Sequence, residues 1–349
     1  MIGALLACAW PPSYIFVSRE QRLREPLEGG GDEEGWLIKA RLWMSAWRCL
    51  LVLAQLLPLL VAGFPLPNMN SLRQARWVAP AIERACRVPA SRSLPPVFEE
   101  GPHFRLVRRE PGRERADLPI WTPSVPNLLP FNDQEAGPVK KTEVPSVPGA
   151  FVLSNVLTDT ECDAISLLSE SMGFTTDAPV SLGRDIRQNE NCVIIADDSM
   201  WQPIFRRVKE HMPPLVAGGA PVGLNQRWRL YKYGKNDIFR MHTDGAWPGS
   251  ALNEAGDLVQ DFFGDRFSQL TFLLYLDDDY EGGETTFLVQ NSGEAHLVSV
   301  AVPKGGALCF FHGEHPMSPL HEGSLVTRGL KRIVRTDVLY SLPDPACGS

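Results

Sequence analysis

The chain has 349 residues, of which 44% are hydrophobic and 21% are charged, and its formal net charge is −7. This hydrophobic fraction supplies a core and excludes a wholly disordered chain, and the acidic balance argues against a dedicated nucleic-acid-binding protein. Seven scattered cysteines without a Cys-x-x-Cys pair exclude a disulfide scaffold and give no structural zinc site. We therefore expect a globular catalytic domain with further segments attached.

Residues 1–64 are expected to form a leader. Residues 49–64 carry no charge and follow Arg48, as the apolar core of a secretory signal or signal-anchor follows its basic residues. The run is longer than most buried apolar helices and shorter than the ~20 residues that span a bilayer, so a buried helix is the alternative. We predict a location in the endoplasmic reticulum lumen, or a membrane anchor through 49–64, with plastid and cytoplasm as alternatives. Translation from Met1 or from Met44 fits equally.

Residues 65–145 are expected to be a linker or stalk rich in proline and arginine. Half of the prolines, 15 of 30, fall between Pro65 and Pro148. Proline lacks a backbone donor and restricts φ, so this stretch should hold no long helix or central strand, with partial order around Trp121 and Phe131.

Residues 146–343 have the pattern of a folded domain. Thr158 and Glu161 form a capping-box signature that opens an amphipathic helix ending at Gly173, and a second helix is expected over 200–211. Strand patterns follow at 227–233, 270–276, 285–289, 297–302, 307–311 and 332–340. Helices followed by many strands predict an antiparallel barrel or sandwich, not a Rossmann alternation.

The first candidate for chemistry is the His242-Thr-Asp244 sequence. On a strand, residues two apart point to the same side, so the imidazole and the carboxylate would converge on one point. Two histidines and one carboxylate on one face of a non-haem Fe(II) ion leave coordination positions open for oxygen chemistry. The second histidine must come from a later strand, where His312, His315 and His321 are the candidates.

The sequence around these residues resembles the 2-oxoglutarate- and Fe(II)-dependent dioxygenases of the prolyl 4-hydroxylase type. Tyr233-Gly before His242-Thr-Asp244 is similar to the first motif of that family, and 270–277, 282–287 and 303–311 are similar to its next strands. His321-x-Gly323 followed by Lys331 is similar to its last motif. The resemblance extends from residue 149 to 342.

The resemblance implies a double-stranded β-helix (jelly roll, cupin-like) in a mainly β fold with N-terminal flanking helices. It implies that His242, Asp244 and His321 bind Fe(II), with His315 as the alternative third ligand. Lys331 would bind the C5 carboxylate of the co-substrate 2-oxoglutarate, because a buried carboxylate needs a paired cation, and Arg335 competes for that role. Tyr275 and Thr271 would donate hydroxyl groups to the same carboxylate, and Tyr233 would line the pocket.

The implied reaction is hydroxylation of an unactivated C–H bond, in a peptidyl proline or in another substrate, with consumption of O2 and release of succinate and CO2. Ascorbate is the implied reductant, and the substrate would be a protein, a peptide or a small molecule such as a free amino acid. A non-catalytic cupin-like binding module and a metallohydrolase are the rival functions. The long stretch 246–267 after the His-x-Asp motif is expected to be a substrate-covering lid or a solvated loop.

Overall fold

The computed structural model describes residues 98–178, 183–291 and 294–343, all within the compact unit Ser93–Ser349. Among these residues, ten strands form the main sheet in the order β1-β2-β6-β8-β19-β12-β16-β4-β3, with β7 paired to β19. The bounds are β1 (Phe104–Glu110), β2 (Leu118–Pro123), β3 (Lys140–Glu143), β4 (Phe151–Ser154), β6 (Glu190–Ile195), β7 (Pro221–Leu224), β8 (Arg227–Tyr233), β12 (Arg266–Tyr275), β16 (Ala307–Phe311) and β19 (Lys331–Ser341). The β2–β6 pair is parallel and the other pairs are antiparallel.

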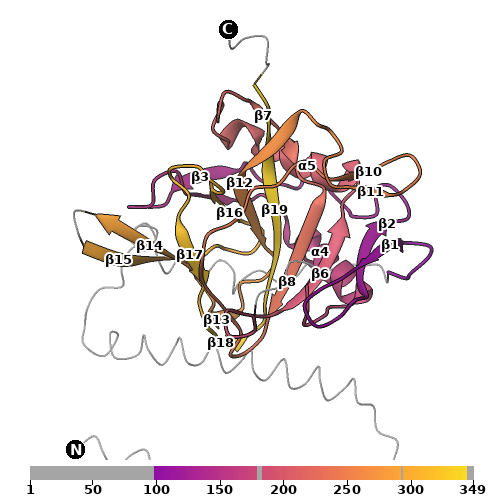
Figure 1. Ribbon diagram of the computed structural model, residues 1–349, viewed down its shortest axis with the longest axis horizontal. Coiled ribbons are helices and arrows are strands. Elements are labelled where there is room, and N and C mark those ends of the chain that lie inside the picture. Colours follow the sequence, from indigo (N-terminus) through magenta and orange to yellow (C-terminus); the bar gives the residue numbers. More distant parts are fainter. Residues whose placement is uncertain (1–97, 179–182, 292–293, 344–349) are drawn as a thin grey trace, which may run out of the picture. The chain divides into compact units, whose positions relative to one another are not determined.

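A smaller sheet in the described residues has five strands in the order β15-β14-β17-β9-β5 (Figure 1). These strands are β5 (Arg187–Gln188), β9 (Ile238–His242), β14 (Thr285–Asn291), β15 (Glu294–Val300) and β17 (Leu320–Gly323). Two short pairs complete the strands, β10 (Ala251–Leu252) with β11 (Leu258–Val259) and β13 (Tyr280–Gly282) with β18 (Val326–Gly329). The mainly β, jelly-roll fold predicted from the sequence is confirmed.

The central strands of the main sheet are buried on both faces, as the alternation along β12 shows. On β12, Phe272 and Leu274 pack in one core with the helices α4 (Asp159–Met172) and α5 (Asp198–Val208). Leu273 and Tyr275 point the other way, into a second core with Phe287 of the smaller sheet. Successive side chains of a strand alternate between faces, so one strand serves both cores. The candidate site residues lie on the face toward the smaller sheet.

The two predicted helices are present. The Thr158 hydroxyl accepts a hydrogen bond from the Glu161 backbone and the Glu161 carboxylate accepts one from the Thr158 backbone, which is the predicted capping box. Helix α5 begins at Asp198 with Asp197 as its N-cap, and the 3-10 helix η2 (Lys209–His211) extends it to the predicted end.

The linker predicted over 65–145 is wrong for residues 98–145. Strands β1, β2 and β3 all join the main sheet, and Leu118, Ile120 and Trp121 of β2 are buried. Pro119 and Pro123 of β2 are both tolerated, because β2 forms only a short parallel ladder with β6, between Ile120–Trp121 and Val193–Ile194. Residues 65–97 lie outside the described residues.

The stretch 246–267 is ordered, with β10 and β11 forming a short hairpin within it. Leu258 packs with Ile120, Val193 and Ile195, and its carbonyl accepts a hydrogen bond from Arg108. The stretch is therefore packed against the main sheet through Leu258, while 254–255, 260–262 and 264–265 are exposed to solvent. No helix in the described part of the chain is long and apolar enough to span a membrane, and the run 49–64 lies outside that part.

Candidate active site

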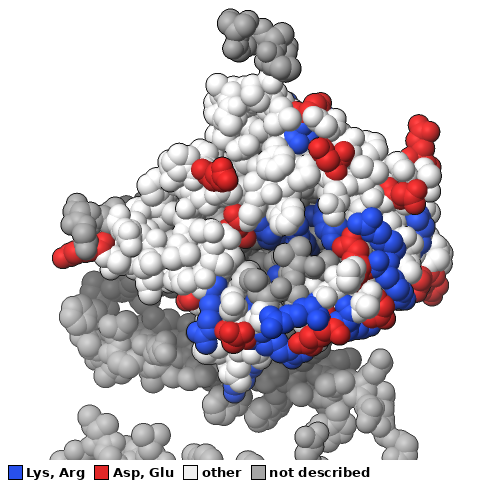
Figure 2. Space-filling model, in the orientation of Figure 1, with Lys and Arg blue, Asp and Glu red and all other residues white. Residues whose placement is uncertain are grey.

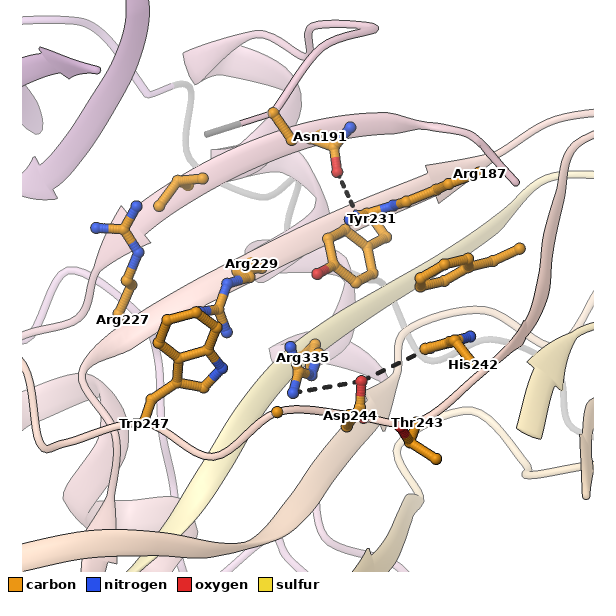
Figure 3. A pocket seen from close by; sticks show the side chains of 14 residues that line it. Arg187, Asn191, Arg227, Arg229, Tyr231, His242, Thr243, Asp244, Trp247 and Arg335 are labelled. Carbon is orange, nitrogen blue, oxygen red and sulfur yellow. Dashed lines mark hydrogen bonds and ion pairs between the residues drawn. The ribbon is translucent and has the colours of Figure 1, made fainter. Parts of the chain in front are cut away.

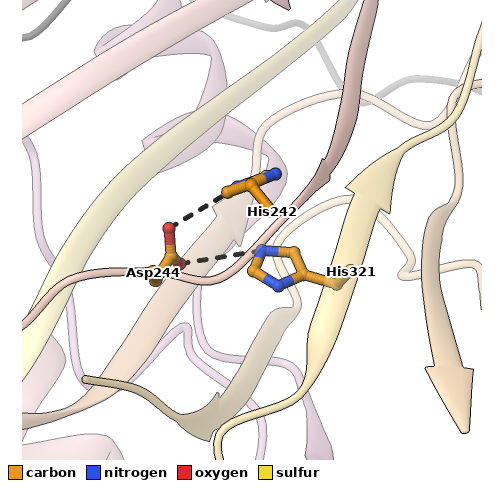
Figure 4. A group of neighbouring side chains, drawn as sticks. All are labelled: His242, Asp244 and His321. Carbon is orange, nitrogen blue, oxygen red and sulfur yellow. Dashed lines mark ion pairs between the residues drawn. The ribbon is translucent and has the colours of Figure 1, made fainter. Parts of the chain in front are cut away.

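His242, Asp244 and His321 meet between the two sheets (Figure 4). His242 ends β9 and is paired with His321 of β17 in the register of the smaller sheet. The Nε2 atom of His242 lies 3.6 Å from Oδ1 of Asp244, and Nε2 of His321 lies 3.7 Å from Oδ2. One ligand atom from each residue falls within 4.8 Å of the others, a spacing that fits three ligands of one metal ion.

The outer nitrogen of each imidazole is fixed by the backbone. The Nδ1 atom of His242 lies 2.8 Å from the carbonyl oxygen of Arg240, and Nδ1 of His321 lies 3.2 Å from that of Pro319. A carbonyl only accepts, so both Nδ1 atoms donate and both Nε2 lone pairs face Asp244. Burial lowers the pKa of His321 to about 4, so this ring is neutral at physiological pH and able to bind a metal.

Asp244 is held ionised by its surroundings. Burial opposes its charge, but the pKa of Asp244 is held well below its usual value, chiefly by the Arg335 guanidinium 3.4 Å away. The hydroxyl of Thr271 donates to Oδ2 of Asp244 over 2.7 Å. The carboxylate is thus charged and oriented before any metal binds.

The expected role of Thr271 is wrong. Its hydroxyl lies on Asp244 and 2.9 Å from Nδ1 of His312, not beside Lys331. Thr271 and Tyr275 do share a face of β12, but four strand residues separate them by about 13 Å, more than one carboxylate can bridge. The prediction that Thr271 and Tyr275 share a face of β12 was therefore right. Their separation along the strand prevents both hydroxyl groups from reaching the same carboxylate.

Lys331 forms a second, separate site with the aromatic residues that the sequence associated with it. Its side chain is buried, its ammonium donates to the carbonyl of Gly283 over 2.5 Å, and it lies 5.1 Å from the Tyr275 ring and 5.5 Å from the Tyr233 ring. Burial lowers the pKa of Lys331 to about 8. Gly283, at φ +70°, has a conformation that favours glycine and brings this carbonyl to the ammonium.

Thr285 was missed in the sequence. Its hydroxyl lies 2.6 Å from the Tyr275 hydroxyl, so both hydroxyl groups belong to the Lys331 site. The motif Gly282-Gly-Glu-Thr285 was noted only as a strand start, although its threonine was the available signal.

Arg335 and Lys331 lie at different positions along β19. Arg335 pairs with Arg229 in the strand register and contacts Asp244, whereas Lys331 pairs with Tyr233. The four-residue spacing again corresponds to about 13 Å, so the two cations cannot bind the same carboxylate. Arg335 is thus beside the histidine–aspartate group and Lys331 is at the far end of the same inner face. This geometry favours Lys331, and not Arg335, for the C5 carboxylate.

The other two candidate histidines, His312 and His315, are engaged elsewhere. His315 stacks on Phe311 with ring centroids 3.8 Å apart. His312 is buried, with Nε2 2.9 Å from the Ser268 hydroxyl and Nδ1 beside Thr271. Of the three candidates only His321 lies with His242 and Asp244 among the described residues.

Residues 228–338 match the model of the family described as the 2OG-Fe(II) oxygenase superfamily. This match spans His242, Asp244, His321 and Lys331. These residues form a 2OG-Fe(II) oxygenase domain. The enzyme is a 2-oxoglutarate-dependent dioxygenase that uses Fe(II), and its sequence resembles the prolyl 4-hydroxylases.

A relative and several solved structures resemble this oxygenase. "Prolyl 4-hydroxylase 1" of Arabidopsis thaliana is 24% identical over 251 residues, which cover 66% of this chain and 81% of the relative. A prolyl-4-hydroxylase from Pseudomonas putida covers 54% of this chain and 92% of its own, with 13% identity and a TM-score of 0.35. A prolyl hydroxylase from Trichoplax adhaerens, solved with a peptide fragment of hypoxia inducible factor, covers 58% of this chain and 87% of its own, with 15% identity and a TM-score of 0.37.

The residues present fit both groups that an oxygenase of this family needs. Two imidazoles and one carboxylate are the donor set that Fe(II) oxygenases use. Lys331 makes no ion pair with a described residue although it is buried, and an unpaired buried cation is costly until an anion reaches it. Iron at the histidine–aspartate group and the C5 carboxylate of 2-oxoglutarate at Lys331 satisfy both requirements.

Proposed function

We propose that the substrate of this dioxygenase is a peptidyl proline, of which one unactivated C–H bond is hydroxylated. The observation that carries the proposal is the separation of two sites on one inner face, the histidine–aspartate group and the buried Lys331 ammonium, with an open pocket beside Asp244. The named relative, a prolyl 4-hydroxylase, supports proline as the hydroxylated residue.

Bound iron supplies the activation of O2, coupled to oxidation of 2-oxoglutarate to succinate and CO2. The residues of the chain hold and orient the reactants. His242, Asp244 and His321 present their ligand atoms to the iron, and Lys331 fixes the distal end of 2-oxoglutarate. The buried walls formed by Tyr231, Tyr233, Tyr275 and Phe287 exclude water from this space.

We also propose ascorbate as the reductant that returns oxidised iron to Fe(II). The resemblance to the prolyl 4-hydroxylase type supports this assignment. Loss of activity over successive turnovers without ascorbate, and its recovery on addition of ascorbate, would support it.

The substrate proposal is tested by succinate release from the full chain with Fe(II) and 2-oxoglutarate. Peptides that contain proline should raise succinate release and gain the mass of one oxygen, and free amino acids should do neither. His242→Ala, which removes one ligand, is the control. If only free amino acids were hydroxylated, the substrate would be a free amino acid and not a peptide. If 2-oxoglutarate bound but no compound led to succinate release, the protein would be a non-catalytic binding module.

We propose further that residues 49–64 direct the protein to the secretory pathway, where it would meet newly made secreted chains. The uncharged run after Arg48 supports this proposal. A fluorescent reporter fused to residues 1–70 should enter the endoplasmic reticulum. A diffuse cytosolic signal or import into plastids would contradict it.

A further inference from the structure

The pocket beside His242 and Asp244 is lined by arginine. It encloses about 160 Å³, and Arg187, Arg227, Arg229 and Arg335 all contribute to its wall. Figure 3 shows Arg187 and Arg229 on either side of Tyr231, with Arg335 between Arg229 and Asp244. Strand parity explains the gathering, because Arg227, Arg229 and Tyr231 lie two apart on β8 and therefore point to one face.

The pocket continues into a second hollow of about 470 Å³. Arg227, Arg229 and Trp247 line both, and the second reaches Arg108 and Arg109 on β1. In Figure 2, Lys and Arg side chains gather over the part of this face that β8, β6 and β1 occupy in Figure 1. Together the two hollows give more room than a free amino acid needs, and they suit an extended chain that crosses the site.

Two of the four arginines are balanced by carboxylates. Glu110 accepts a hydrogen bond from Arg227 over 2.7 Å, and Arg335 contacts both Asp244 and Asp337, at 3.4 and 3.3 Å. Arg229 has only Asp337, 3.8 Å away, and its buried Nη1 atom makes no hydrogen bond with a described residue.

Arg187 is held by neutral groups alone among the described residues. Its guanidinium donates to the amide oxygens of Asn189 and Asn191, over 2.9 and 2.6 Å, and lies over the rings of Tyr231 and Phe239. It makes no ion pair with a described residue. These contacts fix the position of the cation and leave its charge uncompensated.

A surplus of positive charge remains when the metal site is loaded. Iron(II) and Lys331 together carry as much positive charge as Asp244 and dianionic 2-oxoglutarate carry negative charge. Arg229 and Arg335 then share Asp337 as their one remaining carboxylate among the described residues, and Arg187 has none there. Burial would raise the pKa of Tyr231, but these three arginines lower it, which reports the same positive field. Buried unpaired cations are costly, so an incoming anion is the natural partner.

We infer that Arg229 and Arg187 bind a carboxylate side chain of the substrate, so that the enzyme acts on a peptide with an acidic residue next to the hydroxylated one. The inference rests on the proposed function, since it assumes that a peptide occupies the pocket. Guanidinium groups bind carboxylates through paired, charge-assisted hydrogen bonds, which confer preference as well as affinity.

Matched peptides test this inference. Each pair has the same proline-containing sequence, with aspartate or glutamate beside the proline in one member and asparagine or glutamine in the other. The full chain with Fe(II) and 2-oxoglutarate should show a kcat/KM about tenfold or more higher for the acidic member, as charge-assisted hydrogen bonds provide. Arg229→Gln and Arg187→Gln should bring this ratio close to one. Arg184→Gln, which changes an exposed arginine paired with Glu114, is the control and should keep the full ratio.

The ratio separates recognition from damage, because a misfolded variant loses activity toward both members of a pair. A wild-type ratio of one, or a ratio unchanged in both pocket variants, would overturn the inference. Hydroxylation of free dicarboxylic amino acids without any peptide turnover would overturn the peptide part of it.

A binding measurement distinguishes failure of this inference from failure of the proposed function. Fluorescence anisotropy of a labelled acidic peptide, with the full chain holding Mn(II) and 2-oxoglutarate, needs no turnover. Binding about tenfold or more tighter than that of the amide peptide, lost in Arg229→Gln, would support the arginine site even where no succinate forms. Equal binding of the two peptides would reject the site, even if some proline peptide is hydroxylated.

Discussion

His315 and His321 lie six residues apart and have different surroundings. His315 stacks on Phe311, whereas His321 faces Asp244 and His242 with its Nδ1 proton committed to a carbonyl. The sequence ranked His321 first through Gly323 and Lys331, and the geometry agrees with this ranking.

We predict that His321→Ala abolishes substrate-dependent succinate release, because two remaining ligands hold iron weakly. His315→Ala should keep most of the activity, since its ring stacks on Phe311 and accepts a hydrogen bond from the Met317 backbone, away from His242 and Asp244. Metal binding measured by calorimetry and succinate release should fall together in the first variant only. If His315→Ala were inactive and His321→Ala active, His315 and not His321 would be the third metal ligand.

Lys331 gives a pH dependence with a defined sign. Its pKa is lowered to about 8 by burial, and binding of the 2-oxoglutarate carboxylate requires the charged ammonium. Above pH 8, Lys331 must take up a proton before 2-oxoglutarate binds. The affinity for 2-oxoglutarate should therefore fall as pH rises, by up to about tenfold per pH unit. Below pH 7 the ammonium is already charged and this dependence should vanish.

Calorimetric titration of 2-oxoglutarate into the manganese-loaded protein between pH 6.5 and 9.5 measures this slope. Lys331→Arg is the matched control, because a guanidinium stays charged throughout this range. A flat profile in this variant is expected even if its affinity is lower. The same slope in both proteins would assign the titration to another group.

At the scale of elements, α4 and α5 are joined through one buried carboxylate. Glu161 caps α4 by accepting from the Thr158 backbone, accepts from the Asn132 backbone, and receives two hydrogen bonds of 2.8 Å from Arg207 near the end of α5. Both side chains are almost fully buried, at 1% and 7% exposure. The pair therefore fixes the helices to each other and to the loop before β3.

We predict that Glu161→Gln lowers the free energy of unfolding by about 3 kcal/mol, because it removes the buried charged partner of Arg207 and leaves only the half-exposed Asp133. Asp133→Asn, which removes the half-exposed partner of the same arginine, should cost less than about 1 kcal/mol. Urea unfolding followed by circular dichroism measures the free energy of unfolding of both variants and of the wild type. Equal losses would mean that Asp133, and not Glu161, holds the two helices.

At the scale of the whole described unit, the N-terminal strands belong to the catalytic fold. Strand β2 lies between β1 and β6, and β6 pairs with β8, which carries the arginines of the pocket. Phe104, Leu118 and Ile120 are buried by this arrangement. The boundary predicted at residue 146 therefore cuts through the main sheet.

We predict that a chain beginning at residue 146 is insoluble or melts at least 10 °C below one beginning at residue 93. Removing β1 to β3 exposes both edges of the sheet, at β6 and at β4, and several fully buried side chains, each worth about 1.5–3 kcal/mol of burial. Differential scanning fluorimetry of the two proteins measures the difference. Equal melting temperatures would restore the stalk interpretation for residues 98–145.

Local patterns were enough to predict the helices, several strands and the fold class. A capping box and a period-two alternation depend on contacts within a few residues, so Thr158, Glu161 and 227–233 were predictable from the sequence. The resemblance to the dioxygenases added His242, Asp244, His321 and Lys331, which the structure arranges as two sites. The prolines in β2 and in the segments around β1 and β3 misled the prediction, because the cost of a proline depends on whether a neighbouring strand needs its missing N–H group.

The sequence by itself determined the chemistry of the site, since residue type and spacing along a strand define which groups share a face. The tertiary structure alone decided which strand faces pack against each other and which positions along the strands come into contact. It placed Thr271 on Asp244, Thr285 on Tyr275, and Arg335 beside Arg229 in the wall of the pocket. The physical reason is that strand parity repeats every two residues, whereas contact across sheets depends on register, which long-range pairing sets.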